Sequence, residues 1–285
     1  MTQTVTPALI KELRERTGVG MTKCKEALDE AKGNMDTAIE ILRKAGMASA
    51  VKKQGRETKE GCIVAKDNAD SIAVVEVNAE TDFVVKNDKF QEFCKKIAEE
   101  AAATKPASLE AFLAQKYSKD GSTTIEALRS LIIQVIGENI QLRRLEVIKK
   151  NPKHSYGIYS HLGGKILTLV ELNTPNETDL ARDIAMHVAA GVPQVAEFVS
   201  PTDVPEEVLI KEREIARSQI MNKPANIIEK IVDGKVNAFC DQICLIRQKF
   251  IKDESMTIME LLAKKGSPEG KTIHVVRFLR WQIGV

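Results

Sequence analysis

The stretch IAVVEVNAETDF at residues 72–83 decides the fold, because a diverged copy of it, ILTLVELNTPNETDL, occupies residues 166–180. Each copy is rich in β-branched residues and follows a shorter apolar run, which begins at Gly61 in the first copy and Gly157 in the second. Each copy therefore predicts two β-strands joined by a turn, followed by an Asn/Asp/Thr-rich turn and an amphipathic helix. We expect two similar α+β subdomains.

The N-terminal region has the apolar spacing of three short helices, at about 7–17, 22–33 and 36–46. Pro7 suits the first turn of a helix, and a glycine stands at or just beyond the end of each segment. Helices this short are not stable singly, so we expect a three-helix bundle. The polar stretch 52–61 has no apolar period and predicts a linker.

The C-terminal part contains a second helical region, at about 203–243, with charged outer faces and a break at Asn222-Lys223-Pro224. This pattern predicts an antiparallel helical hairpin that projects from the second subdomain. A last helix at 257–265 and a closing strand at 272–281 follow.

These patterns predict an α+β protein of three parts. Residues 1–54 form the three-helix module, residues 55–140 form the first α+β subdomain, and residues 141–285 form the second subdomain with its hairpin insertion.

The composition limits the kinds of partner. Lys and Arg number 42 against 40 Asp and Glu, a net charge of +2, and a nucleic-acid-binding protein usually has a basic surplus. No apolar stretch has the length of about 18 residues that a membrane helix requires, and the N-terminus has no signal-like apolar region. We expect a cytoplasmic protein that contacts neither nucleic acid nor membrane directly.

The sequence offers little to an enzyme, a metal ion or a cofactor. The five cysteines are odd in number and include no Cys-x-x-Cys pair, so buried free thiols are expected rather than disulfides or zinc ligands. The stretch GSPEGKT at 266–272 is one residue shorter than a phosphate-binding loop and precedes a strand rather than a helix. His187 lies in an apolar helical segment and is expected to be a hydrogen-bonded core residue.

One stretch, NAETDFVVKN at 78–87, invites two interpretations. Thr81 or Asp82 is suited to capping a helix, and Phe83 to filling a core. The second copy keeps Glu-Thr-Asp but has Leu180 where the first has Phe83, which leaves room for a role of Phe83 outside the common fold.

Several dispersed motifs resemble the elongation factor Ts family. They occur in the family's order and cover nearly the whole chain: LRERTGVGM at 13–21, KCKEAL at 23–28, VEVNAETDFV at 75–84, IGENI at 136–140 and IAMHVAA at 184–190. The resemblance implies a guanine nucleotide exchange factor that binds elongation factor Tu, with no cofactor and no catalytic residue of its own. Its N-terminal module would be a three-helix bundle similar to ubiquitin-associated domains.

The resemblance also assigns residues. It implies that the N-terminal module docks on the partner's GTPase domain through Arg14, Met21 and Thr22. The segment Thr81-Asp82-Phe83-Val84 would enter beside the partner's magnesium site, where Phe83 acts as a wedge and Asp82 disturbs the shell of the ion. Ile136 and Gly137 would contact the same domain, and His161 the partner's third domain, while His187 stays structural.

Alternatives remain at this point. The chain could be a scaffold that binds a partner without exchange activity, which should tolerate loss of Phe83, or a small-molecule enzyme, which would require a polar cluster in a pocket. Asp82 could act on the ion or only cap a helix, and the hairpin could serve partner contact or self-association. Longer family members carry a further C-terminal helical segment, whose contacts are not expected from a sequence ending at Val285.

Overall fold

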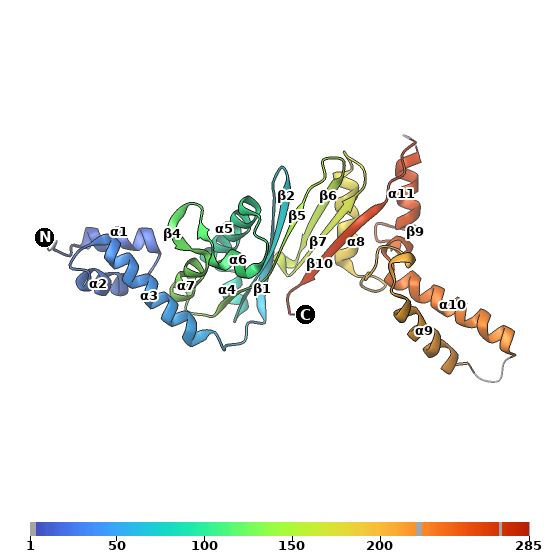
Figure 1. Cartoon of the computed structure of the whole chain (residues 1–285), viewed down its shortest axis with the longest axis horizontal. Helices are drawn as coiled ribbons and strands as arrows, with labels where there is room; N and C mark the ends of the chain where they lie inside the picture. The colour runs from blue at the N-terminus through green and yellow to red at the C-terminus, as the bar shows by residue number, and fades with distance from the viewer. Residues whose placement is uncertain (1–3, 221–223, 268–269, 285) are drawn as a thin grey trace. The chain divides into compact units, whose positions relative to one another are not determined.

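The computed structural model describes residues 4–220, 224–267 and 270–284 (Figure 1). The chain is a mixture of helices and small antiparallel sheets, which confirms the predicted α+β class. It divides into two compact units. The first comprises Met1–Lys150 with Gly163–Lys165 and Gln282–Val285, and the second Asn151–Leu162 with Ile166–Trp281.

The N-terminal region forms three helices, α1 (Pro7–Thr17), α2 (Met21–Glu30) and α3 (Met35–Lys53). Pro7 lies at the start of α1 after the capping residue Thr6, and Gly18 ends α1 with a left-handed φ of 69°. Their shared core is formed by apolar side chains from all three helices, among them Leu13, Cys24, Leu28, Ala38 and Leu42.

Helix α3 is longer than predicted. Asn34 caps it, and it continues through Gly46, the predicted end, to Lys53. A Cβ atom at Gly46 would lie 3.2 Å from the carbonyl oxygen of Ser130 on α7 (Ile125–Ile136). Gly46 therefore permits close packing of two helices instead of ending one. The predicted linker at 52–61 shortens accordingly, since α3 and a strand occupy its two ends.

The first sheet has the antiparallel order β1 (Glu60–Asp67), β2 (Ser71–Ala79) and β5 (Ile140–Lys149). Helix α5 (Asp88–Thr104) packs on β1 and β2, and α6 (Leu109–Ala114) and α7 complete the same core. The predicted boundary after residue 140 thus falls within β5. This strand pairs with β2 and belongs to the first compact unit.

The second sheet has the corresponding order β6 (Ser155–His161), β7 (Ile166–Leu172) and β10 (Val275–Gln282). Helix α8 (Thr178–Ala190) packs on β6 and β7. Helix α11 (Ile258–Gly266), capped by Thr257, precedes β10. The loop-like stretch at 266–272 therefore connects a helix to a strand, the reverse of a phosphate-binding loop; its residues Pro268 and Glu269 lie outside the described residues.

The two sheets share a buried glutamate on their middle strand. Glu76 accepts a hydrogen bond from Arg144 Nε at 2.5 Å, and Glu171 accepts one from Arg277 Nε at 2.8 Å. With these glutamates aligned, the strand register places Tyr156 where the first sheet has Ile63. Gly157 therefore corresponds to Val64, and the predicted alignment of Gly157 with Gly61 is displaced by three residues.

The internal repeat also extends further than the sequence comparison detected. KYSKDGSTTI at 116–125 and KFIKDESMTI at 249–258 each form a small hairpin that leads into a helix capped by its threonine. These hairpins are β3 (Lys116–Tyr117) with β4 (Asp120–Thr124), and β8 (Lys249–Phe250) with β9 (Asp253–Thr257). Lys116 pairs with Thr124 in the first hairpin as Lys249 pairs with Thr257 in the second.

Two helices, α9 (Glu206–Ser218) and α10 (Ala225–Ile243), lie between α8 and β8, where the first unit has the short helix α6. Arg213 pairs with Asp233 at 2.6 Å and Arg217 with Glu229 at 2.9 Å, a pattern that requires antiparallel helices. Of the predicted break, Asn222 and Lys223 lie outside the described residues.

All five cysteines are free and buried, as predicted. Among the described residues, no helix combines the length and apolar character needed to cross a membrane.

Gly157 has no room for a side chain, because α8 crosses β6 directly above it. A Cβ atom there would lie 2.1 Å from the carbonyl carbon of Ala181 and 2.1 Å from the nitrogen of Arg182. We expect Gly157→Ala to lower the free energy of unfolding by about 3 kcal/mol, since α8 must move. Gly121→Ala is the matched control, because no atom lies within 4 Å of its Cβ position. Denaturant unfolding with equal losses for the two variants would contradict this assignment.

His187 is buried on α8, in agreement with its expected structural role. Its Nε2 lies 2.9 Å from Gln248 Oε1, and its Nδ1 accepts a hydrogen bond from the Ile251 amide at 3.3 Å. These contacts fit the neutral ring protonated on Nε2. Burial lowers the pKa of His187, although the hydrogen bond with Gln248 acts in the opposite direction.

This lowered pKa predicts a pH dependence of stability. The unfolded histidine takes up a proton below about pH 6.5, whereas the folded one does so only at lower pH. Stability should therefore fall as the pH drops from about 6.5 toward the folded pKa, by at most about 1.4 kcal/mol per pH unit. Denaturant unfolding of wild type and His187→Gln at several pH values should give a shallower slope for the variant. His274→Gln, at an exposed histidine, is the control, and identical slopes for wild type and His187→Gln would contradict the expectation.

Candidate partner-binding site

The turn after β2 presents an aromatic side chain to solvent. Helix α4 (Asp82–Val85) has only four residues and is capped by Thr81, whose Oγ1 accepts a hydrogen bond from Val84 N at 3.4 Å. Val84 and Val85 are each 8% exposed and pack into the core of the first unit, whereas Phe83 is 81% exposed. Phe83 is more exposed than any other large apolar residue in the described part of the chain.

The two copies of the repeat differ at this point. In the second copy, Leu180 is buried and α8 runs without interruption from Thr178 to Ala190. In the first copy, the helix breaks after Val85 and α5 restarts with Asn87 as its cap. Because the second copy buries an apolar residue here, exposure of Phe83 is not a requirement of the shared fold.

Asp82 lies beside Phe83, and its side chain is 45% exposed. Its carboxylate accepts a hydrogen bond from Lys86 Nζ at 2.8 Å, one helical turn away. This hydrogen bond lowers the pKa of Asp82 and raises that of Lys86, so the carboxylate is ionised at neutral pH. Since Thr81 accepts the capping hydrogen bond, Asp82 is not the cap of α4.

A second reversal, from α7 into β5, lies against this turn. Helix α7 ends at Gly137, an exposed residue with a left-handed φ of 95°. The Glu138 carboxylate accepts hydrogen bonds from Thr81 N at 3.0 Å and Thr81 Oγ1 at 2.7 Å. Glu80 in turn accepts one from Asn139 N at 2.5 Å. The motifs at 75–84 and 136–140 thus meet, because the sheet register pairs their strands.

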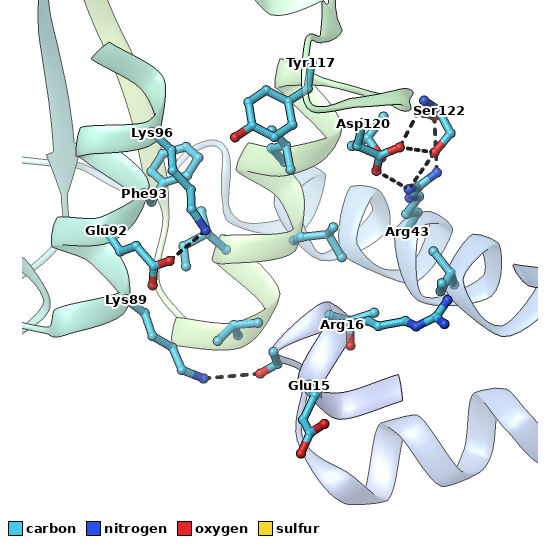
Figure 2. Close-up of a pocket in the computed structure, with 18 of the residues that line it drawn as sticks. Glu15, Arg16, Arg43, Lys89, Glu92, Phe93, Lys96, Tyr117, Asp120 and Ser122 are labelled. Atoms are coloured by element: carbon cyan, nitrogen blue, oxygen red, sulfur yellow. Dashed lines mark hydrogen bonds and ion pairs between the residues drawn. The ribbon is translucent and has the colours of Figure 1, made fainter. Parts of the chain in front are cut away.

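The turn between α1 and α2 is fixed near the same place. The Gly18 carbonyl accepts a hydrogen bond from Lys89 Nζ at 3.2 Å, which Figure 2 draws as a dashed line from Lys89. Lys89 lies in the first turn of α5, soon after Phe83 in the chain. A Cβ at Gly18 would lie 3.9 Å from a methyl group of Val135. The turn therefore rests on α5 and on the end of α7.

The predicted docking residues flank this α1–α2 turn. Arg14 is exposed in the last turn of α1, and Met21, 44% exposed, and Thr22 open α2. Of the remaining pair, Ile136 is half-buried and Gly137 exposed at the end of α7. Contacts with α5 and α7 thus connect the α1–α2 turn, the turn that carries Phe83 and the reversal from α7 into β5, which are far apart in the sequence.

A groove of about 720 Å³ lies between the N-terminal helices and helices α5 and α7 (Figure 2). Several of its polar side chains are engaged with one another: Arg43 donates to Asp120 at 3.0 Å and to Ser122 Oγ at 3.1 Å, and Lys96 pairs with Glu92 at 2.8 Å. We attribute the groove to packing between these helices.

Among the described residues, no cluster of three or more His, Cys, Asp or Glu side chains could hold a metal ion.

His161 belongs to the second compact unit and is exposed at the end of β6. Its Nδ1 lies 3.1 Å from the Tyr159 hydroxyl, and the two rings stack with centroids 5.8 Å apart. This contact orients the imidazole at the surface.

Sequence reasoning did not identify Glu80, Lys89 and Glu138 as residues that support the site. Glu138 stands within the quoted motif IGENI and Glu80 within the repeated strand-to-helix turn, but the spacing in sequence does not reveal the hydrogen bonds between them. Lys89 has no sequence signal, because its partner is a backbone carbonyl 71 residues away.

Together these features describe an α+β protein that exposes an aromatic side chain beside an ionised carboxylate, on a turn that is hydrogen-bonded to a second chain reversal. A sequence model described as elongation factor TS matches residues 80–285. Elongation factor Ts from Protochlamydia amoebophila is 58% identical over 281 residues, covering 98% of this chain and 99% of the relative. Elongation factor Ts from Chlamydia muridarum is 45% identical over 276 residues, covering 96% and 97%. The chain belongs to the elongation factor Ts family.

The difference in burial between Phe83 and Val84 predicts that their substitutions differ in their effect on stability. Phe83→Ala should change the free energy of unfolding by no more than about 0.5 kcal/mol, because the side chain makes few contacts with its own chain. Val84→Ala should lower it by about 2 kcal/mol, since it leaves a small cavity in the core. Denaturant unfolding tests both, and a large loss from Phe83→Ala would show that this residue has a structural role.

Proposed function

We propose that this chain is a guanine nucleotide exchange factor for elongation factor Tu, which binds the GDP-bound partner and accelerates release of GDP during translation elongation. The observation that carries the proposal is the exposure of Phe83 on a short turn whose other apolar residues are buried. Membership of the elongation factor Ts family supports the identity of the partner. In this role the chain lowers the affinity of another protein for its nucleotide and performs no chemical reaction itself.

The proposed contacts divide among the parts of the chain. Residues 1–54, with Arg14, Met21 and Thr22, dock on the GTPase domain, and Ile136 and Gly137 contact the same domain. His161 meets the partner's third domain. The exposure of Arg14, Met21, Thr22, Gly137 and His161 supports these assignments.

The Thr81-Asp82-Phe83-Val84 segment acts on the magnesium site of the partner. Phe83 inserts between partner helices, and the ionised Asp82 disturbs the oxygen shell of the ion, since Mg²⁺ favours carboxylate ligands. The ion pair of Asp82 with Lys86 is exposed and contributes little, so Asp82 can exchange partners readily. Thr81 and Val84 hold the turn from within, because Thr81 caps α4 and Val84 is buried.

Thermodynamic linkage explains how binding becomes exchange. Magnesium neutralises phosphate charge, so its displacement weakens GDP binding. An exchange factor binds the nucleotide-free partner more tightly than the GDP-bound partner. By linkage, it lowers the partner's affinity for GDP by the same ratio by which GDP lowers the partner's affinity for the exchange factor. Burying one Phe contributes about 1.5–3 kcal/mol, or roughly 10- to 150-fold in an equilibrium constant. Loss of the ion and the wider interface supply the remainder.

The test is stopped-flow release of a fluorescent GDP from elongation factor Tu. Wild type should accelerate release strongly, and Phe83→Ala should reduce that acceleration at least about tenfold while remaining folded. Binding without acceleration by the wild type would reject exchange and favour a scaffold that holds its partner passively.

Asp82 is tested separately. If the carboxylate disturbs the ion, Asp82→Ala should reduce the acceleration of release while leaving the melting temperature nearly unchanged. Asp88→Ala, at a nearby exposed acidic residue in the first turn of α5, is the matched control and should retain wild-type activity. Equal reductions from both variants would indicate a general effect of negative charge rather than a contact at residue 82.

A further inference from the structure

The Glu138 carboxylate accepts two hydrogen bonds from the turn that carries Phe83. One of its oxygens accepts from the Thr81 amide at 3.0 Å and the other from the Thr81 hydroxyl at 2.7 Å. Hydrogen bonds to a carboxylate are stronger than those between neutral groups. Glu138 is itself held in place, because Gly137 before it ends α7 and the Asn139 amide after it donates to Glu80.

Thr81 transmits this contact to α4. Its hydroxyl has a single hydrogen, which it donates to Glu138, so a lone pair remains to accept from Val84 N at 3.4 Å. Glu138 thereby selects the orientation of the hydroxyl that caps α4. A helix of four residues is not stable alone, so α4 depends on this cap and on the buried side chains of Val84 and Val85.

The Phe83 side chain makes few contacts with the rest of the chain, since it is 81% exposed. Its direction is set by the backbone of α4 and therefore by the cap. A turn that is ordered before binding avoids the entropy loss of ordering on the partner.

From these contacts we infer that Glu138 is a positioning residue for exchange: it fixes the Thr81 cap and so holds Phe83 in its binding direction. This inference rests on the proposed exchange function, and Glu138 itself need not touch the partner. Its removal lowers the fraction of the chain in the competent form, which reduces the acceleration of GDP release without unfolding the protein.

Glu138→Gln tests the inference, with Glu126→Gln as matched control. Glu126 is also a paired carboxylate of the α7 region, but it binds Arg129 on its own helix. In stopped-flow release of fluorescent GDP from elongation factor Tu, Glu138→Gln should lower the maximal acceleration about tenfold, as expected for loss of a charged hydrogen bond. Glu126→Gln should behave as wild type.

The double variant Phe83→Ala/Glu138→Gln separates positioning from a direct contact. If Glu138 acts through Phe83, the double variant should release GDP as slowly as Phe83→Ala alone, within about twofold. The inference would be overturned if the two substitutions reduced GDP release by the product of their separate effects, or if Glu138→Gln kept wild-type activity. Thr81→Val, which removes the hydroxyl that Glu138 orients, should lower the acceleration of GDP release as Glu138→Gln does.

A second measurement does not depend on exchange activity. Amide hydrogen exchange of the free chain should become at least about tenfold faster at Val84, Val85 and Lys86 in Glu138→Gln, while the amides of β2 stay protected. Unchanged protection of this turn would overturn the inference even if wild type accelerates GDP release. If the turn loosens in Glu138→Gln but wild type fails to accelerate GDP release, the structural contact of Glu138 with the turn is supported. The proposed exchange function is then rejected, and the role of Glu138 in exchange with it.

Discussion

Two carboxylate contacts between neighbouring chain reversals are the constraint on which the presented surface depends. Glu138 accepts from Thr81, and Glu80 accepts from Asn139, across the ends of the paired strands β2 and β5. The register of the sheet, which sets Ala79 opposite Ile140, brings these groups within reach. The sheet thus determines where the turn lies, and the carboxylates determine how α4 leaves it. Phe83 is exposed because Val84 and Val85 occupy the core beneath it.

The internal repeat shows how such a surface can arise from an ordinary structural unit. Both copies have a middle strand with a buried glutamate, a third strand with its arginine partner, and a small hairpin that leads into a threonine-capped helix. The copies differ where α8 is continuous and buries Leu180, whereas the first copy breaks the helix and exposes Phe83. The proposed action on the partner's magnesium site thereby belongs to the copy that departs from the common fold, whereas the second copy keeps a buried leucine at this position.

Much of the fold was predictable, because hydrophobic periodicity and capping residues are local signals. The α+β class, the paired strands of both copies and the buried cysteines follow from them. The end of α3 was not predictable, since Gly46 is a packing site against Ser130 and sequence alone does not distinguish that from a helix stop. The predicted alignment of Gly157 with Gly61 was wrong for a similar reason, because a glycine is required at residue 157 where α8 crosses β6. At the site, the motifs were identifiable, but Glu138 and Lys89 act through contacts between distant segments.

The claim that the segment around Phe83 acts on the partner's magnesium ion is tested most directly by varying that ion. GDP release from elongation factor Tu should be measured with and without this chain across a range of magnesium concentrations, down to excess chelator. Removal of the ion alone already weakens GDP binding, so we predict that the acceleration due to the chain shrinks as magnesium is withdrawn. We also predict that wild type and Asp82→Ala converge in chelator. An acceleration that is the same at every magnesium concentration would contradict the proposal and assign exchange to contacts that leave the ion in place.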